Sequence, residues 1–422
     1  MSMELVIVGG GASGLMAAIT SKRILGDAVN VTILERLERS GKKILATGNG
    51  KCNLTNASLD KKYYNEPNFV EAAFKKFGYN ETINFFDSIG VLTKVDRDGR
   101  VYPLPEAATA VVDNLRNELK RLNIEERINF DIRKIQKNTH LFTLINSRGL
   151  KVEADAVIIA SGGKASPVLG SNGTSMQLLK SFDLKLTENY PGLIGVKVDQ
   201  NLIKGLGGIR VKGVVSLYEK KDKIWEDSGE IQFKNDGISG IVIMQMTSHI
   251  GRIMLKRPRA SFTFSIDLWP DKTQEEVNQY LLDRQYRFKD LANENFLVGV
   301  VNKSLGINLL RRAKIEIAGD VKDISHREML RLGNLIKNLS FDVKSTYDFA
   351  NAQVTIGGLD LKEVNPDTLE VLKVPGLFVS GEALNVDGEC GGFNLQWAWT
   401  SGYLAGTGAA MYLHNLLFSS EE

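Results

Sequence analysis

The N-terminal residues place a short apolar strand, a glycine-rich turn, a helix and a second strand in direct succession. Glu4–Val8 and Val29–Leu34 are rich in β-branched residues, and the stretch Leu15–Leu25 between them has helical character. The turn GGGASG fits the pattern G-x-G-x-x-G, and Glu35 lies 21 residues after its last glycine. This order predicts a β-α-β unit that binds a dinucleotide at the turn.

Each residue type in this motif has a physical role in holding a pyrophosphate and a ribose. Gly9 makes the tight turn, Gly11 lets the pyrophosphate approach the backbone, and Gly14 lets the helix pack on the sheet. The helix N-terminus directs N–H groups at the phosphates, and the acidic residue accepts hydrogen bonds from the ribose. From this unit we predict the following cofactor-binding residues: Gly9, Gly11, Ala12, Ser13, Gly14, Glu35 and Arg36.

The segments after Glu35 indicate which dinucleotide is bound. The chain does not continue with further β-α units but with a long stretch of helices and loops. Strand-like runs follow at Ile128–Ile135 and Leu141–Ile145, and a buried strand, Val152–Ala160, ends in Ser161-Gly162-Gly163. This layout resembles the FAD-binding domains of the glutathione-reductase type, so the predicted fold class is α/β with a Rossmann-like FAD-binding domain.

The C-terminal region carries two further patterns that suit a flavin. A strand-like run ends in Gly381-Glu382, which resembles the second flavin fingerprint of such folds, although most of them have Asp in place of Glu382. Gly391 and Gly392 then precede an apolar helix predicted over 394–414. The N-terminus of that helix would offer free N–H groups and partial positive charge to the negative charge of a reduced flavin.

Five further segments, spread along the chain, carry a more specific pattern. They are GKKILATGNGKCNLTN, IIASGGKASPVLGSNG, GEIQFKNDGISG, ANAQVTIGGL and GLFVSGEALNVDGECGGFNLQWAW. Together they resemble one family, the HI0933-like (BaiN-type) NAD(P)/FAD-dependent oxidoreductases, in family order over nearly the whole chain. The resemblance implies a bound FAD and three parts: an FAD-binding domain (1–190 and 354–422), an inserted β-rich domain (191–271 and 340–353) and an inserted helical domain (272–339).

The loop ATGNGKCNLTN is part of the predicted site, since in this family it wraps the flavin side of the cofactor. Where the family often has Gly-Gly-Gly-Arg before the cysteine, this chain has Gly-Asn-Gly-Lys, which keeps a basic residue but loses the bidentate reach of arginine. The predicted cofactor-binding residues beyond the first motif are Lys42, Lys43, Gly48, Gly50, Lys51, Cys52, Asn53, Ile132, Ser161, Gly162, Gly163, Gly381, Glu382, Gly391, Gly392, Phe393, Asn394 and Leu395.

The pattern of apolar and polar residues changes along the region that is predicted as an insertion. Alternating runs typical of strands occur at Ile194–Val198, Val211–Tyr218 and Ala260–Ile266. Three amphipathic helices are then predicted within 275–297, 300–313 and 326–339. The pattern returns to strand at Phe341–Phe349 and Val354–Ile356.

Composition and charge give little support for a nucleic-acid or membrane partner. The net charge is +3 over 422 residues, and no apolar run reaches transmembrane length. We expect a cytoplasmic protein that acts on a small-molecule substrate, with nucleic acid an unlikely partner. Seven basic residues gather in the inserted region, either as solvated faces or as a docking surface for nucleic acid or a phosphorylated cofactor: Arg252, Lys256, Arg257, Arg259, Arg311, Arg312 and Lys314.

Residues that could carry out catalysis are few. Tyr102 either donates a proton or packs, and Cys52 and Cys390 either form a redox pair or are small neighbours of the flavin. The four histidines, at 140, 249, 326 and 414, are too scattered to predict a metal site. After residue 150 no second G-x-G-x-x-G follows a strand, and Gly205–Gly208 lies in strand-like sequence. We therefore expect NAD(P)H, as electron donor, to dock without a Rossmann domain of its own.

Three functional hypotheses follow from these patterns and from the resemblance. The first is an NAD(P)H-dependent reductase of an electron-poor double bond, with hydride transfer at flavin N5. The second is a flavin oxidase of a small amine, of the aminoacetone type, that passes electrons to O₂. The third is a flavoprotein that binds RNA, against which the low net charge counts.

Overall fold

The fold was analysed in a computed structural model that describes residues 3–139 and 141–419. The chain divides into two compact units. The first unit combines Met1–Pro191 with Phe349–Glu422, and the second unit is Gly192–Asp348. Each has its own hydrophobic core. Among the described helices, none has both the length and the apolar character needed to cross a bilayer.

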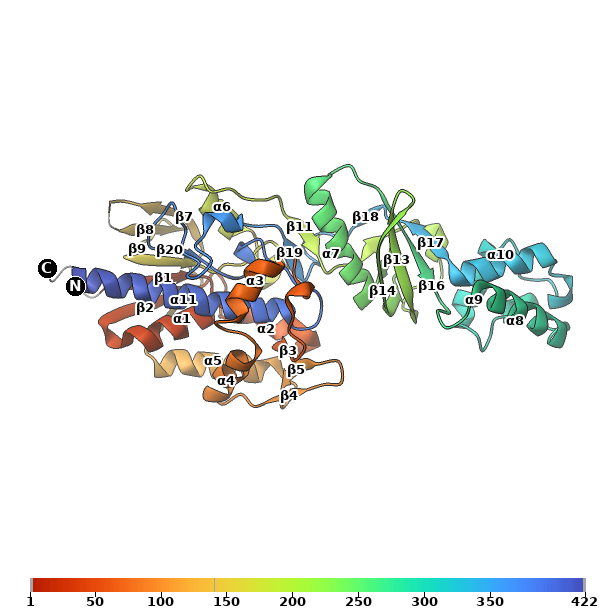
Figure 1. The fold of residues 1–422 in the computed structure, drawn as a ribbon, viewed down its shortest axis with the longest axis horizontal. Coiled ribbons are helices and arrows are strands. Elements are labelled where there is room, and N and C mark those ends of the chain that lie inside the picture. The colour runs from red at the N-terminus through yellow and green to blue at the C-terminus, as the bar shows by residue number, and fades with distance from the viewer. Residues whose placement is uncertain (1–2, 140, 420–422) are drawn as a thin grey trace. The chain divides into compact units, whose positions relative to one another are not determined.

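The first unit is built on a parallel sheet of five strands in the order β20-β10-β1-β2-β6. Three of these strands, β20, β1 and β2, are labelled in Figure 1. Every neighbouring pair in this sheet is parallel. The apolar runs of its inner strands are buried on both faces, as expected for a parallel sheet. The strands are β1 (Met3–Val8), β2 (Val29–Leu34), β6 (Glu125–Arg127), β10 (Ala156–Ile159) and β20 (Leu377–Val379).

Two helices from opposite ends of the chain lie side by side in the first unit. They are α1 (Ala12–Leu25) and α11 (Phe393–Ser419) (Figure 1). A Cβ added at Gly402 would lie 2.4 Å from the carbonyl oxygen of Ser13, and one added at Gly406 would lie 2.6 Å from that of Ala17. These glycines of α11 therefore let the two helix backbones approach closely.

Three small sheets and five further helices complete the first unit. The β7-β8-β9 sheet is an antiparallel meander, and β3-β5-β4 is a second three-stranded antiparallel sheet. The strands are β3 (Thr55–Asn56), β4 (Thr93–Val95), β5 (Arg100–Pro103), β7 (Ile132–Lys137), β8 (Phe142–Asn146), β9 (Lys151–Ala154), β11 (Tyr190–Gly192) and β19 (Val354–Ile356). The helices are α2 (Lys42–Ala46), α3 (Pro67–Phe74), α4 (Tyr79–Ser88), α5 (Ala108–Arg121) and α6 (Thr174–Lys180).

The second unit contains a seven-stranded sheet in the order β17-β16-β13-β14-β15-β12-β18, with antiparallel pairs throughout. Its strands are β12 (Val196–Lys197), β13 (Arg210–Glu219), β14 (Asp222–Phe233), β15 (Ile238–Ser239), β16 (Phe262–Asp267), β17 (Leu339–Asp342) and β18 (Ser345–Thr346). Its helices are α7 (Ile241–Lys256), α8 (Gln274–Arg287), α9 (Lys303–Arg312) and α10 (His326–Lys337). Val215 and Phe264 of the sheet share one hydrophobic core with Leu305 and Leu332 of the helices.

The strand and helix patterns agree with the structure in many places, but several differ. The run 341–349 is divided between β17, which ends at Asp342, and β18, and only the end of the run 128–135 lies in β7. The run 152–160 is not one strand: β9 ends at Ala154, β10 begins at Ala156, and the two belong to different sheets. Between them, Asp155 accepts a hydrogen bond from the backbone N–H of Glu4. The helix α7 was not predicted, because its apolar, β-branched start resembles a strand. The division of the insertion into a β-rich and a helical domain stays a prediction.

Candidate flavin-binding site

Four of the predicted motifs meet at one edge of the parallel sheet. β1 leads into Gly9, β2 into Glu35, β10 into Ser161 after one intervening residue, and β20 into Ser380. Because all of these strands run in the same direction, their carboxyl ends lie at a common edge. Open parallel sheets bind their ligands at this edge, so the topology brings distant segments of the chain to one place.

The three glycines of the first motif are required for different reasons. Gly9 has φ +109°, and a Cβ there would lie 2.7 Å from the carbonyl oxygen of Ala160. A Cβ at Gly14 would lie 1.9 Å from the carbonyl oxygen of Gly9. The helix α1 can therefore contact the turn at Gly9 only if residue 14 has no side chain. A Cβ at Gly11 would meet no described atom within 4 Å. Gly11 therefore leaves open space where the motif places the pyrophosphate.

The N-terminus of α1 offers unpartnered N–H groups beside this space. Gly11 is the N-cap residue, and no described side chain caps the helix. The first N–H groups of a helix lack partners within the helix, and the helix dipole adds partial positive charge there. The geometry suits an anionic group such as a pyrophosphate.

Glu35 is almost fully buried, with 8% of its surface exposed. Its Oε2 atom accepts a hydrogen bond from the N–H of Gly10 at 2.7 Å, and its Oε1 atom accepts one from Leu37 at 2.8 Å. Burial raises the pKa of this carboxyl group, while these two backbone hydrogen bonds act in the opposite direction. A carboxylate oxygen can accept two hydrogen bonds, so each oxygen of Glu35 can accept one more from a ribose hydroxyl.

Several buried polar atoms around this edge have no hydrogen-bond partner among the described residues. Leaving such an atom unpaired costs about 1–3 kcal/mol, so native proteins rarely do so without a reason. A dinucleotide with hydroxyl, phosphate and amide groups would supply the missing partners, which fits the FAD expected here. The atoms in or beside the predicted motifs are Arg36 Nε, Ser40 Oγ, Asn53 Oδ1, Ser161 Oγ and Ser380 Oγ.

Ser40 and Ser380 lie outside the residues predicted from the sequence. A Cβ added at Gly10 would lie 2.2 Å from Ser40 Oγ and 3.2 Å from Glu35 Oε2, so the hydroxyl and the carboxylate flank the same glycine. Ser380 directly precedes Gly381, whose N–H donates to Ser401 Oγ at 2.9 Å. Ser40 lies just before the segment that begins at Gly41, and Ser380 lies within the C-terminal segment but was not singled out, so only the burial of each hydroxyl group identifies it.

The loop Ala46–Asn56 is held in an unusual backbone conformation. Positive φ angles occur at Gly48, Asn49, Gly50 and Cys52, with values of 56°, 55°, 84° and 59°. Asn49 and Cys52 adopt a region that L-residues rarely enter, at a cost of order 1–3 kcal/mol each. Such strain persists where the surroundings fix the loop and is typical of functional sites.

Both cysteines are free thiols. The Cys52 side chain is buried, which raises its pKa to about 12, although a hydrogen bond with Thr47 acts in the opposite direction. Burial likewise raises the pKa of Cys390 to about 12. Both groups therefore stay protonated at neutral pH, and neither has the thiolate character that nucleophilic or disulfide-exchange chemistry needs.

Two of the three predicted lysines form ion pairs with nearby glutamates. Lys42 binds Glu38 at 2.7 Å, as an i,i+4 pair. Lys51 forms an ion pair with Glu106, which also pairs with Lys94. The hydrogen bonds with these two lysines lower the pKa of Glu106 to about 2.

Lys43 and Glu382 form an ion pair of 2.8 Å, although 339 positions separate them in the chain. The other carboxylate oxygen of Glu382 accepts a hydrogen bond from the N–H of Thr355 at 3.2 Å. The glutamate at this position therefore ties the segment after the first motif to the C-terminal fingerprint. The sequence placed both residues at the site but did not indicate that they pair.

Thr355 fixes the glycine pair that follows β10. A Cβ at Gly163 would lie 2.2 Å from Thr355 Oγ1, and Gly162 has φ +72°. Thr355 Oγ1 also accepts hydrogen bonds from the N–H groups of Lys164 and Ala165, at 2.8 and 3.0 Å. Thr355 was not predicted as a site residue, because its role depends on contacts with a segment far away in the sequence.

The glycine pair before α11 packs against the cysteine loop. Gly392 has φ +100°, and a Cβ there would lie 2.5 Å from the carbonyl oxygen of Thr55 and 2.9 Å from Asn53 Oδ1. The side chain of Asn394 forms hydrogen bonds with the backbone of Gly388. Its Oδ1 atom accepts one from the N–H of Gly388, and its Nδ2 atom donates one to the carbonyl of the same residue. This observation favours a loop-fixing role for the Asn394 side chain, while its backbone lies at the helix start.

The remaining predicted residues are partly or fully enclosed by protein. Ile132 is buried at the start of β7, and the N–H of nearby Phe130 donates to the carbonyl of Glu35 at 2.8 Å. Phe393 is buried and stacks on Tyr63, with ring centroids 4.4 Å apart. Leu395 packs against the core as a partly buried side chain. Because the side chain of Ile132 is buried, only its backbone can face a cofactor.

Tyr102 lies on β5, next to the cysteine loop. A Cβ at Gly48 would lie 3.5 Å from the Tyr102 ring. Partial burial raises the pKa of its hydroxyl group above the usual value, so the phenol is protonated at neutral pH. Within the described residues, no three His, Cys, Asp or Glu side chains gather as metal ligands do; His140 lies outside those residues.

The fold and the edge geometry define a flavoprotein of the glutathione-reductase type, and the protein is an FAD-dependent oxidoreductase. The chain matches the family described as HI0933-like protein Rossmann domain over residues 3–408, and it belongs to this family. The resemblance seen in the sequence motifs is thereby confirmed.

Named relatives cover nearly the whole chain, and they include the following two. The 3-dehydro-bile acid delta(4,6)-reductase of Clostridium scindens is 37% identical over 409 residues, which are 96% of this chain and 98% of the relative. The ribosomal RNA dihydrouridine synthase of Escherichia coli is 25% identical over 409 residues, 95% of this chain and 96% of the relative.

A solved structure shows a similar fold at low sequence identity. The 3-ketosteroid delta1-dehydrogenase from Sterolibacterium denitrificans, in complex with 1,4-androstadiene-3,17-dione, superposes with a TM-score of 0.50 and 12% identity. The match covers 96% of this chain and 99% of that structure. At this identity the likeness concerns the fold alone.

Proposed function

We propose that this protein reduces a carbon–carbon double bond conjugated to a carbonyl group in a small organic substrate, with NAD(P)H as the electron donor. The observation that carries the proposal is the 37% identity, over 96% of the chain, to a protein named as a bile-acid double-bond reductase. FAD, when bound, supplies hydride transfer at its N5 atom. The protein has to position the cofactor, exclude water and supply a proton.

The chain's own residues account for the positioning. The open N-terminus of α1 binds the pyrophosphate, the space above Gly11 admits it, and Glu35 accepts from the ribose. The hydroxyl groups of Ser40 and Ser161 pair with polar atoms of the same cofactor. The ion pair of Lys43 with Glu382 and the strained cysteine loop hold the segments that enclose the flavin end.

We propose Tyr102 as the group that donates the proton. Reduction of the double bond adds hydride to one carbon and a proton to the other, while NAD(P)H becomes NAD(P)⁺. The phenol of Tyr102 is protonated at neutral pH and lies beside the cysteine loop. Tyr102→Phe should lower the rate of double-bond reduction about a hundredfold or more and leave flavin reduction by NAD(P)H unchanged. Tyr403→Phe, which keeps its ring stacked on Phe77, is the matched control.

The electron donor is tested by mixing the purified holo-protein with NADH or NADPH without oxygen while following the visible absorption of the flavin. The proposal predicts rapid bleaching by at least one nicotinamide nucleotide. Bleaching by a small amine such as aminoacetone, and by neither nucleotide, would contradict the reductase and support the alternative of an amine oxidase that uses O₂.

A second candidate function is the reduction of uridine in ribosomal RNA. Two relatives, from Escherichia coli and Haemophilus influenzae, are named ribosomal RNA dihydrouridine synthase, with 25% and 26% identity over 95% of this chain. The reaction class is the same, because the double bond of uracil is also conjugated to a carbonyl. The second unit has 25 Lys and Arg against 20 Asp and Glu, whereas the first has 28 against 30. This charge separation suits an RNA partner better than the net charge of the whole chain suggests.

RNA as substrate is tested by incubating the holo-protein and NADPH with ribosomal RNA and measuring dihydrouridine by mass spectrometry after nuclease digestion. Formation of dihydrouridine at one position would favour the second candidate. Its absence, together with turnover of a small unsaturated ketone, would favour the first.

A further inference from the structure

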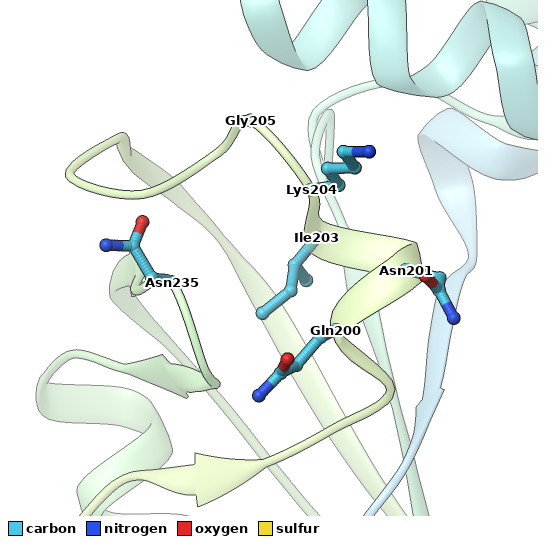
Figure 2. A pocket seen from close by; sticks show the side chains of 6 residues that line it. All are labelled: Gln200, Asn201, Ile203, Lys204, Gly205 and Asn235. Carbon is cyan, nitrogen blue, oxygen red and sulfur yellow. The ribbon is translucent and has the colours of Figure 1, made fainter.

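The second unit has a polar pocket that the flavin site does not use. Its volume is about 360 Å³, at the lower end of the range for small-ligand sites. Figure 2 shows that it lies between a short helical turn, a glycine loop and a hairpin turn, all within the second unit. The lining residues are Gln200, Asn201, Ile203, Lys204, Gly205 and Asn235.

The turn that carries Gln200 and Asn201 is fixed from both sides. Asp199 caps the 3₁₀ turn Gln200–Ile203 by accepting a hydrogen bond from the N–H of Asn201 at 2.9 Å. Nδ2 of Asn308, on α9, donates to the carbonyl of Leu202 at 3.1 Å. This wall of the pocket is therefore held in place before any ligand arrives.

The opposite wall is a hairpin turn with its own anchor. The N–H of Lys234 donates to the carbonyl of Gly237 at 2.8 Å, which closes the turn between β14 and β15. Asp236 accepts a hydrogen bond from the hydroxyl group of Tyr347 at 2.5 Å. A Cβ added at Gly207 would lie 2.0 Å from Asn235 Oδ1, so the glycine loop rests directly on the Asn235 side chain.

The polar groups of the pocket are available for a ligand. Within the described chain, the amide groups of Gln200 and Asn235 have no hydrogen-bond partner, and both side chains are exposed. Lys204 is exposed and has no carboxylate within ion-pair distance among the described residues. Gly205 has φ +80°, and a Cβ there would meet no described atom within 4 Å, so a ligand can approach the backbone closely.

We propose that this pocket binds a nucleotide. Side-chain amides present a donor and an acceptor side by side, which matches the edge of a nucleobase, and an ammonium group suits a phosphate. In this arrangement Gln200 and Asn235 bind the base. Figure 2 shows the exposed Lys204 side chain directed away from these two residues, so it binds the phosphate after rotating toward Gly205. The ammonium nitrogens of Lys197 and Lys234 lie 5.5 and 5.0 Å from the centre of the Tyr347 ring and add positive charge near the same hairpin turn.

The nucleotide can come from either of two sources. One is the adenylate part of a nicotinamide dinucleotide, and the other is a nucleotide of an RNA chain. The inference deepens the proposed function, because the two sources correspond to its two candidates. Binding at the pocket can nevertheless be measured without turnover, so a failure of the proposed reaction and a failure of the pocket are distinguishable.

The test is a titration of the oxidised holo-protein with 5′-AMP and 5′-UMP, followed by calorimetry. Asn235→Ala and Lys204→Ala should each weaken binding of at least one nucleotide about tenfold. Lys220→Ala, which removes a positive charge from the exposed connection between β13 and β14, is the matched control and should leave the affinity unchanged. An unchanged flavin spectrum and melting temperature show that each variant is folded.

Two further measurements separate the sources. If the pocket holds the adenylate of the donor, Asn235→Ala raises KM for NADPH and leaves the affinity for a labelled single-stranded RNA unchanged. If it holds an RNA nucleotide, the same variant weakens RNA binding and leaves KM for NADPH unchanged. Absence of binding by both mononucleotides, or equal binding by the variants and the control, would overturn the inference.

Discussion

Three of the four long helices described in the second unit begin differently from α1 of the first unit, whereas the fourth, α7, begins at Gly240 without a side-chain cap, as α1 does at Gly11. In the second unit, α8, α9 and α10 are each capped by a side chain that accepts a hydrogen bond from the first turn: Thr273, Asn302 and Ser325. In the first unit, α1 begins at Gly11 without a side-chain cap among the described residues. Each cap side chain satisfies one N–H group in the first turn of its helix, whereas the first turn of α1 has no such cap and is open to the ligand that we propose there.

The polar groups of the two candidate sites differ in how far they are buried. At the sheet edge of the first unit, the hydroxyl groups of Ser40, Ser161 and Ser380 are enclosed and lack described partners. In the pocket of the second unit, the polar side chains are exposed and solvated when no ligand is bound. The two proposed sites therefore differ: at the sheet edge the cofactor would pair with enclosed polar atoms, whereas in the pocket a ligand would bind to exposed ones.

The largest expected effect concerns the first glycine motif. Gly14→Ala should destabilise the apo-protein by about 3 kcal/mol or more and abolish flavin binding, because the new Cβ collides with the backbone at Gly9. Gly11→Ala is the matched variant. It should change apo-protein stability by about 1 kcal/mol or less, since its Cβ meets no described atom, but weaken FAD binding at least about tenfold.

Chemical denaturation of the apo-proteins and flavin titration separate the two outcomes. Equal loss of stability in both variants would contradict the distinction between a packing glycine and a ligand-facing glycine.

Ser40→Ala should sharpen the contrast between buried and exposed polar groups. Removing a hydroxyl that lacks a partner in the apo-protein should leave its stability unchanged or raise it by up to about 1 kcal/mol. The same change should weaken FAD binding several-fold. Ser21→Ala, where the hydroxyl bonds to the carbonyl of Ala17 within α1, is the control and should leave the affinity for FAD unchanged. Unchanged FAD affinity in Ser40→Ala would remove this serine from the site.

Thr273→Ala tests the contribution of a helix cap in the second unit. It removes the hydrogen bond that Thr273 accepts from the N–H of Glu276, and it should destabilise the second unit by about 1 kcal/mol. The flavin content and spectrum of the purified protein should not change, because the cap lies in the other unit. Loss of flavin in this variant would show that the units are coupled.

Cys52→Ser should have the smallest effect. The buried thiol, with its pKa of about 12, is protonated at working pH, so replacing sulfur with oxygen should keep FAD bound and the reaction rate within about twofold. Iodoacetamide should react slowly with Cys52 in the folded protein at pH 8, because the reactive thiolate is scarce at that pH. Loss of FAD or of activity in Cys52→Ser would assign the sulfur a direct role.

Local patterns predicted much of the cofactor edge. The strands β1, β2 and β19 have the predicted cores, and the glycines at 9, 11 and 14 stand where the motif places them, because a turn between strand and helix demands particular residues in sequence. Contacts between distant segments carry the rest. Thr355 packs against Gly163, and Glu382 forms an ion pair with Lys43. Neither contact can be predicted from the local sequence.

Two kinds of feature escaped prediction for physical reasons. The helix α7 begins with an apolar, β-branched run whose periodicity does not distinguish a buried helix from a strand. The left-handed conformations of Asn49 and Cys52 are imposed by the surroundings, since neither residue type requires them. Tertiary context decides both.

The most direct test of the proposed function is the oxidative half-reaction. The flavin is reduced with light and a sacrificial donor in the absence of oxygen and is then mixed with an unsaturated ketone or with its saturated counterpart. The account predicts that the visible absorption of oxidised flavin returns with the unsaturated ketone alone, with one equivalent of saturated product per flavin. Return of the absorption only when oxygen is admitted, with no saturated product, would contradict it.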